Sequence, residues 1–381
     1  MAHCVFLTDS LSFSGGRKLL LERAAYLRSL SGWDVSVLVQ EPTGPLEGIV
    51  DVEVVRDFSP SSIPECDVVV ATTPREVEDA WRAGRGEVVH FCQGFEITDL
   101  EQRVAGRVVP PRYSGTGLFA AARLARKRFS WKRKIKRIDS VYRLPTVLVA
   151  VSRHLAEELA LRYGREVALC ENGVDLSVFH PPDDPPEWGG FSAENPLRII
   201  NVAPGKVTFK GVGTTLRAVA LLKERGAPVR FIRVAPVVTA AERADSVVDE
   251  FHESVPQEKL AELLRSSHVY ISNSTEGEGF GLPALEALAS GVVSVLSSIS
   301  SYRNFAEKED GEKFCLFVPE GDAEATASVV ENALAISPEE IRGLRRRALS
   351  VASRLSLEKS NARFAEILER VAGNRGGGEG R

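Results

Sequence analysis

The stretch Glu278-Gly-Phe-Gly-Leu-Pro-Ala-Leu-Glu286 predicts a glycine-rich loop that leads directly into a helix. Its glycines leave the backbone free to form left-handed turns and to approach a ligand closely, and Pro283 suits the first turn of a helix. Apolar residues then recur at helical spacing until Gly291 ends the pattern. A loop before a helix N-terminus is a site for an anion such as a diphosphate, and the two glutamates can accept hydrogen bonds from hydroxyl groups.

Short runs of apolar β-branched residues alternate with amphipathic segments on both sides of this stretch. The alternation is typical of parallel sheets covered by helices, and continuous apolar runs fit strands buried on both faces. We therefore predict an α/β fold. In the first half, strands are expected at Val5–Thr8, Val35–Val39, Val52–Val55, Val68–Ala71, Val88–Cys92 and Val147–Val151; in the second half, at Arg198–Ala203, Val229–Val234, His268–Ser272 and Val292–Leu296.

A proline-rich segment, Pro181-Pro-Asp-Asp-Pro-Pro-Glu-Trp-Gly-Gly190, separates the two series of strands. It cannot form a regular element and is interpreted as a linker between domains. Open α/β sheets bind ligands at the carboxyl ends of their strands, so two such domains predict a ligand cleft. We expect a first domain at residues 1–180, a linker at 181–196, a second domain at 197–355, a helix at 356–372 that crosses back to the first domain, and a disordered tail at 373–381.

The bulk composition is that of a globular protein long enough for two domains: 381 residues, 44% hydrophobic and 26% charged. The net charge of −4 gives no general attraction to nucleic acid. We expect a cytoplasmic protein, because neither a membrane-spanning apolar run nor a signal peptide is evident. The cysteines are scattered and predict neither a zinc site nor a disulfide framework; they are Cys4, Cys66, Cys92, Cys170 and Cys315.

The two glutamates and the seven residues between them resemble the Glu-x7-Glu signature of retaining glycosyltransferases of family 4, which have the GT-B fold. The resemblance implies two Rossmann-like doubly wound domains that face each other across a cleft. It also implies that Glu286 binds the ribose of a nucleotide-sugar donor and that Glu278 lies beside the transferred sugar. The intervening donor-binding residues would be Gly279, Phe280, Gly281 and Leu282. The alternative is a glycine-rich turn with two solvated glutamates.

The segment Asn201-Val-Ala-Pro-Gly-Lys206…Lys210-Gly211 resembles the Gly-Arg…Lys-Gly segment of the same family. The resemblance implies that Lys206 and Lys210 hold the donor diphosphate and act in catalysis, since fixed positive charge stabilises the leaving group. Lysine at position 206 keeps the charge of the family's arginine but loses its bidentate geometry. The chain has no Asp-x-Asp motif, so we expect neither a metal nor another cofactor.

Two segments of the first half also resemble the family. Gly15 and Gly16 stand where glycines let a loop approach the donor phosphate and the acceptor. In Val88-Val-His-Phe-Cys-Gln-Gly-Phe-Glu96, Gln93 occupies the position of a family histidine near the reacting sugar, and His90 lies three residues earlier. Which of the two side chains serves the sugar or the acceptor stays open, because a lone strand histidine is more often structural.

Residues 123–137 form a basic segment, Arg-Leu-Ala-Arg-Lys-Arg-Phe-Ser-Trp-Lys-Arg-Lys-Ile-Lys-Arg, without an acidic residue. Such a segment can bind an anionic membrane or an acidic acceptor, with Phe129 and Trp131 at the interface. The alternative is a helix with a solvated charged face and inward-facing aromatic residues. Both interpretations stay open, and the first would place the protein on the inner face of the membrane.

Together these features predict a retaining, metal-independent glycosyltransferase of the hexosyltransferase type. It would move a sugar from a nucleotide-sugar donor to a saccharide, a lipid-linked or a small-molecule acceptor. One alternative is another GT-B enzyme, such as a phosphorylase or an epimerase. Another is a protein that binds nucleic acid or an anionic surface through residues 123–137, although no nucleic-acid partner is expected. The sequence identifies neither the donor base and sugar nor the acceptor.

Overall fold

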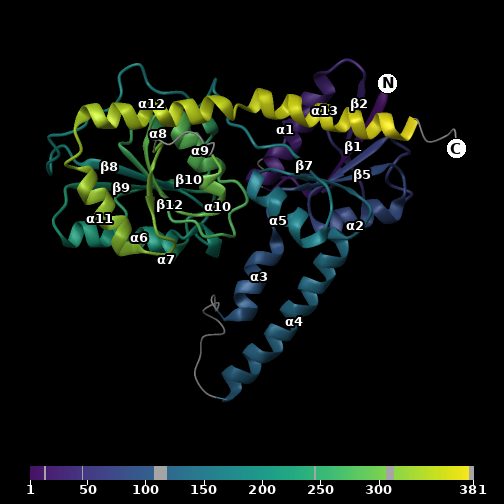
Figure 1. Cartoon of the computed structure of the whole chain (residues 1–381), viewed down its shortest axis with the longest axis horizontal. Helices are drawn as coiled ribbons and strands as arrows, with labels where there is room; N and C mark the ends of the chain where they lie inside the picture. The colour runs from purple at the N-terminus through teal and green to yellow at the C-terminus, as the bar shows by residue number, and fades with distance from the viewer. Residues whose placement is uncertain (13, 45, 107–117, 244–245, 306–312, 377–381) are drawn as a thin grey trace. The chain divides into compact units, whose positions relative to one another are not determined.

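The computed structural model divides the chain into two compact units (Figure 1). Unit 1 comprises Met1–Cys170 and Asn361–Arg381, and unit 2 comprises Glu171–Ser360. Each unit contains one parallel sheet with helices on both faces, so the predicted α/β fold of two doubly wound domains is confirmed. The structure describes the chain except for residues 13, 45, 107–117, 244–245, 306–312 and 377–381.

Unit 1 contains a seven-stranded parallel sheet in the order β3-β2-β1-β4-β5-β6-β7. Strand β1 lies inside this sheet, and its Cys4 pairs with Val35 on one side and with Val68 on the other. The strands are β1 (Ala2–Ser10), β2 (Trp33–Glu41), β3 (Glu53–Val54), β4 (Val68–Ala71), β5 (Glu87–Cys92), β6 (Val147–Ala150) and β7 (Val167–Leu169).

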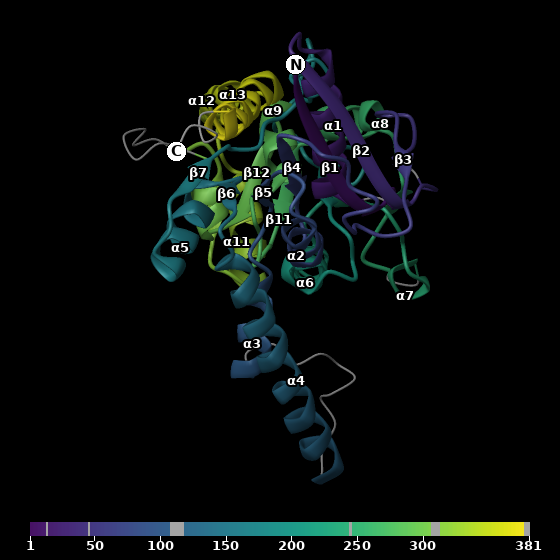
Figure 2. The ribbon, with the colours of Figure 1, turned by 90° about the vertical axis from the view of Figure 1, so that its right-hand side faces the viewer.

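The helices of unit 1 cover both faces of this sheet. Helices α3 and α4 pack on each other and extend beyond the sheet, as Figure 2 shows from the side. On the other face, Arg23 of α1 is buried between the rings of Phe91 and Phe364. The helices are α1 (Gly15–Ser29), α2 (Pro74–Ala83), α3 (Glu96–Ala105), α4 (Leu118–Tyr142), α5 (Arg153–Tyr163) and α13 (Leu357–Gly376).

The last helix, α13, begins in unit 2 and continues into unit 1, where Phe364 packs 5.1 Å from Phe91 and 6.4 Å from Phe6. Residues 373–376, assigned above to a disordered tail, are its last turn. The rest of that expected tail lies outside the described residues.

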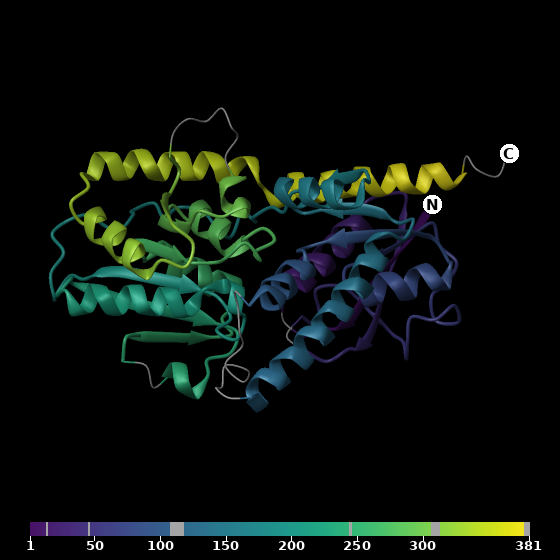
Figure 3. The ribbon, with the colours of Figure 1, turned by 60° about the horizontal axis from the view of Figure 1, so that its bottom comes forward.

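Unit 2 contains a six-stranded parallel sheet in the order β10-β9-β8-β11-β12-β13. Helices α9 and α12 cover one face, and α6 and α11 cover the other (Figure 3). The strands are β8 (Leu197–Val202), β9 (Val229–Ala235), β10 (Glu250–Glu253), β11 (Val269–Ser272), β12 (Val293–Ser297) and β13 (Leu316–Val318). The helices are α6 (Val212–Glu224), α7 (Ala240–Arg243), α8 (Gln257–Arg265), α9 (Leu282–Ala289), α10 (Ser300–Arg303), α11 (Ala323–Ala333) and α12 (Pro338–Arg354).

The proline-rich segment packs as part of unit 2. Trp188 is buried in the core of this unit together with Leu197 and Ile199, and its ring lies edge-on to Phe191 at 5.7 Å. A linker that buries an aromatic residue is anchored, because burying such a side chain stabilises a fold by roughly 1.5–3 kcal/mol. By its contacts, unit 2 therefore begins at Glu171, before the prolines.

Candidate functional site

The loop between β11 and α9 carries Glu278, whose carboxylate is almost fully buried. The loop ends at Gly281, which caps α9 with a φ of 92°. A Cβ atom at this glycine would lie only 2.3 Å from Cε1 of Tyr302. Position 281 thus requires glycine both for its left-handed backbone and for the packing of the tyrosine ring.

The loop between β8 and α6 runs beside the first loop. It ends in a short 3-10 turn, Thr208–Lys210, followed by Gly211 at a φ of 60°. A Cβ atom at Gly211 would lie 1.8 Å from the carbonyl oxygen of Asn273, and the Thr275 N–H donates a hydrogen bond to the Phe209 carbonyl at 2.8 Å. The two loops therefore hold each other in place.

An ion pair joins the two loops: Nζ of Lys210 lies 2.7 Å from Oε2 of Glu278. The side chains are only 17% and 8% exposed, so their attraction is screened less than that of a surface pair. The Ser274 hydroxyl donates to the same oxygen at 3.1 Å, and the Lys210 ammonium lies 5.5 Å from the centre of the Phe209 ring. These contacts fix a positive and a negative group side by side.

The other donor-binding candidates of unit 2 belong to the same two loops or to α9. Lys206 is exposed in the loop between β8 and α6, and Glu286 is half-buried in α9, about one turn after the helix starts. Phe280 is buried against Phe305, with ring centres 5.3 Å apart. The remaining candidates, Gly279 and Leu282, are half-buried at the approach to α9.

In unit 1 the structure brings two of the sequence candidates together. The amide Nε2 of Gln93 donates to the Gly16 carbonyl oxygen at 2.8 Å. A Cβ atom at Gly16 would lie 2.1 Å from Oε1 of Gln93, so only glycine allows this approach. Gly15, the first residue of α1, is exposed.

His90 lies inside the sheet of unit 1 with no exposed surface, its ring 4.6 Å from that of Tyr142. Burial, followed by the nearby charge of Arg165, lowers its pKa from 6.5 to about 3. A neutral side chain without exposed surface cannot reach a sugar or acceptor in this conformation. Gln93, which is partly exposed, is the better candidate for that role.

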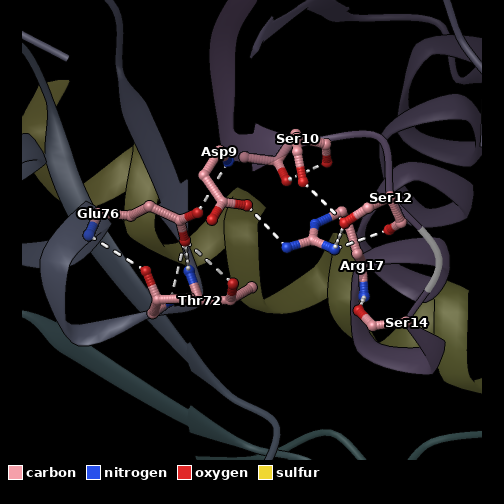
Figure 4. Close-up of polar contacts among 9 residues, drawn as sticks. Asp9, Ser10, Ser12, Ser14, Arg17, Thr72 and Glu76 are labelled. Carbon is pink, nitrogen blue, oxygen red and sulfur yellow. Dashed lines mark hydrogen bonds and ion pairs between the residues drawn. The ribbon is translucent and has the colours of Figure 1, made fainter. Parts of the chain in front are cut away.

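The loop before α1 is braced by polar side chains that sequence analysis did not single out (Figure 4). The Arg17 guanidinium lies 2.7 Å from Asp9 and donates to the Ser12 carbonyl at 2.7 Å. Glu76 accepts from the backbone N–H groups of Asp9 and Thr73 at 3.1 and 2.9 Å. The sequence signal was the capping-box pattern Thr73-x-x-Glu76. It predicted a helix start but not the bond to β1.

Helix α4 contains the basic segment 123–137. Trp131 is buried whereas Phe129 is 63% exposed, so the expectation that both aromatic residues face an interface is wrong for Trp131. The face opposite Trp131 presents exposed side chains at helical spacing, two phenylalanines and three cations: Phe119, Arg126, Phe129, Arg133 and Lys136.

Neither a membrane-spanning helix nor a metal-binding cluster is found among the described residues. No helix there combines the length and the apolar character needed to cross a bilayer. In the same part of the chain, no group of three or more histidine, cysteine, aspartate or glutamate side chains is placed to hold a metal ion.

Comparison with known proteins links this geometry to a family. Residues 198–335 match the sequence model described as glycosyl transferases group 1. The MMP alpha-(1->4)-mannosyltransferase of Mycolicibacterium hassiacum is 32% identical over 269 residues, covering 66% of this chain and 62% of that relative. The chain thus aligns with less than two thirds of the relative's length.

Solved structures share the fold over nearly the whole chain. Sucrose-phosphate synthase from Thermosynechococcus elongatus is similar with a TM-score of 0.72 and 16% identity, over 97% of this chain and 99% of that one. HepE from Anabaena in complex with UDP-glucose is similar with a TM-score of 0.71 and 14% identity, over 97% and 100%. Residues 198–335 are thus similar to the glycosyl transferases group 1 family, and the chain has the GT-B fold of these solved structures.

Proposed function

We propose that this protein is a retaining glycosyltransferase that transfers a hexose from a nucleotide-sugar donor. The observation that carries the proposal is the Lys210–Glu278 ion pair, whose glutamate is buried just before α9, inside the residues that match the family model. The similar mannosyltransferase and the UDP-glucose complex of a protein with the same fold support it. Such a pair offers a cation for a diphosphate next to a carboxylate for sugar hydroxyls.

Each residue then has a defined task. Lys210, with the exposed Lys206, neutralises the charge that develops on the leaving diphosphate. Glu278 and Glu286 accept hydrogen bonds from the sugar and the ribose, and the backbone from Gly279 to Leu282 lies along the donor. Because the positive charge comes from lysines, we propose that no metal ion is required.

The proposed reaction exchanges one carbon–oxygen bond and transfers one proton. The bond between the anomeric carbon and the diphosphate oxygen breaks, and an acceptor hydroxyl oxygen bonds to that carbon on the same face. The hydroxyl proton passes to the departing diphosphate, so no protein base is needed. Gln93 can hydrogen-bond a sugar or acceptor hydroxyl but cannot take up this proton.

The donor is tested by melting temperature, since a ligand that binds the native state raises it. We expect stabilisation by one of UDP, GDP, ADP or TDP, and loss of that stabilisation in Glu286→Ala. Slow transfer to water tests the stereochemistry: NMR should first detect released sugar with the donor's anomeric configuration, with or without EDTA. Release of the opposite anomer would contradict retention, and loss of turnover in EDTA restored by Mg²⁺ would contradict metal independence.

For the acceptor side, we propose that the exposed face of α4 binds an anionic membrane surface. Basic side chains near such a surface contribute roughly 1 kcal/mol each, and Phe119 and Phe129 are exposed among them. The double variant Arg126→Glu/Arg133→Glu should lose co-sedimentation with vesicles containing phosphatidylglycerol and keep its affinity for nucleotide. The matched control Arg342→Glu/Arg346→Glu reverses two exposed charges on α12 and should sediment like the parent. Equal sedimentation of both variants would leave α4 a solvated helix.

A further inference from the structure

Three buried hydroxyl groups form a network beside Glu278. The Tyr302 hydroxyl lies 2.7 Å from Oγ of Ser272 and donates to Oγ of Ser274 at 3.1 Å. Ser274 in turn donates to Oε2 of Glu278. The three side chains come from the end of β11, the loop after it and α10, and each is at most 5% exposed. The carboxylate is therefore connected to a part of the fold that no sequence motif singled out.

The direction of the hydrogen bonds in this network follows from the carboxylate. An ionised carboxylate can only accept, so the single proton of Ser274 points to Glu278. Ser274 Oγ then accepts from its hydroxyl neighbours, Tyr302 at 3.1 Å and Ser272 at 3.2 Å. Burial, and after it the charge of Glu278, raises the pKa of Tyr302 well above its usual value. The tyrosine thus keeps its proton and stays a donor.

The ring of Tyr302 also packs against Gly281, the glycine that caps α9. It occupies the space that a side chain at Gly281 would need, and it packs 5.8 Å from the ring of Phe305. The Ser297 hydroxyl donates to the Ser274 carbonyl, which ties the same loop to β12. One tyrosine therefore supports both Glu278 and the glycine that caps α9.

We propose that Tyr302 and Ser274 are positioning residues that orient the Glu278 carboxylate toward the transferred sugar. Within the described part of the chain, the hydrogen bonds from Lys210 and Ser274 both go to Oε2. This arrangement leaves Oε1 for a sugar hydroxyl. The inference rests on the proposed function, in which Glu278 contacts the sugar and not the nucleotide.

The test separates the affinity for a nucleoside diphosphate from that for the corresponding sugar nucleotide. The probes are UDP with UDP-glucose and GDP with GDP-mannose, measured by calorimetry. Tyr302→Phe keeps the ring and removes the hydroxyl. We expect it to weaken sugar-nucleotide binding or kcat by about tenfold, the size of one hydrogen bond to a charged group, and to leave diphosphate affinity unchanged. Ser274→Ala should cost more, because it removes the direct donor.

A double-mutant cycle identifies the route of the effect. If Tyr302 acts through Glu278, Tyr302→Phe should have no further effect in a Glu278→Ala background. Tyr163→Phe is the matched control, since it removes a tyrosine hydroxyl that bonds Asp139 at 2.7 Å in unit 1. It should leave both affinities unchanged.

The outcomes distinguish this inference from the proposed function. Glu278→Ala could lose affinity for the sugar nucleotide and keep its affinity for the diphosphate while Tyr302→Phe and Ser274→Ala show no such loss. This outcome would overturn the inference alone. An equal loss of diphosphate and sugar-nucleotide affinity in Tyr302→Phe would also overturn it, because it would indicate a general structural role. Parent-like behaviour of Glu278→Ala, or a parent that binds none of the probes, would overturn both.

Discussion

Each unit has a cation paired with a carboxylate near the loop after its first strand, yet the two pairs differ in environment. In unit 1, Arg17 pairs with Asp9 at 2.7 Å, and the aspartate is 52% exposed. In unit 2, Lys210 pairs with Glu278 at the same distance, but the glutamate is only 8% exposed. Water screens the first pair, so its main effect is on the shape of the loop. The second pair retains its electrostatic strength for a ligand that displaces one partner.

Buried carboxylates of the two units differ in the same way. Glu76 of unit 1 is 2% exposed and accepts hydrogen bonds from backbone N–H groups of two segments. Among the described residues, Glu278 accepts hydrogen bonds only from side chains, those of Lys210 and Ser274. A carboxylate held mainly by backbone donors is a structural element, whereas one held by side chains can exchange a partner for substrate. Burial alone therefore does not identify the functional carboxylate; the nature of its donors does.

The largest expected effect comes from the cation of unit 2. Lys210→Ala should lower kcat by about 100- to 1,000-fold, since it removes charge that stabilises the leaving group mainly in the transition state. Diphosphate affinity should fall much less. Steady-state kinetics and calorimetry measure the two effects separately. The matched change Arg17→Ala should lower kcat by less than tenfold, because its partner is already exposed to water. A loss of kcat that is larger in Arg17→Ala than in Lys210→Ala would place the catalytic cation in unit 1 and not in unit 2.

Much of the candidate site could be predicted because its motif is local. The loop glycines, Pro283 and the helix start follow from backbone preferences over a few residues, whereas the contact of Lys210 with Glu278 was found only in the structure. The network around Tyr302 could not be predicted, because it joins residues about thirty positions apart through the order of strands β11 and β12. The same holds for Trp188: proline content predicted a linker, while one aromatic side chain anchored the segment to unit 2.

The next effect tests the two buried carboxylates through stability. Glu76→Ala should lower the free energy of unfolding by about 3 kcal/mol, because several buried N–H groups and a hydroxyl lose their acceptor. Its affinity for nucleotide should stay within twofold of the parent. Glu278→Ala should show the opposite pattern: a smaller loss of stability, since Lys210 is left near the surface, and a large loss of turnover. Urea denaturation and kinetics on both variants measure this. If Glu76→Ala lost turnover without losing stability, the distinction between backbone and side-chain hydrogen-bond donors to the two carboxylates would be wrong.

The effect that is smallest at neutral pH concerns His90, and it grows as pH falls. The folded-state pKa of about 3 lies below the usual 6.5, so the unfolded chain binds a proton more readily between these values. The stability contributed by the neutral histidine is therefore complete above pH 6.5 and is lost as pH falls toward 3, at up to about 1.4 kcal/mol per pH unit. In His90→Phe, which keeps a ring against Tyr142, the free energy of unfolding should lack this part of its dependence on pH. Urea denaturation at several values between pH 4 and 7 measures it. The exposed His180 supplies the control, since His180→Gln should retain the parent's slope. An unchanged slope in His90→Phe would mean that water reaches the ring, and His90 would again compete with Gln93 for the acceptor role.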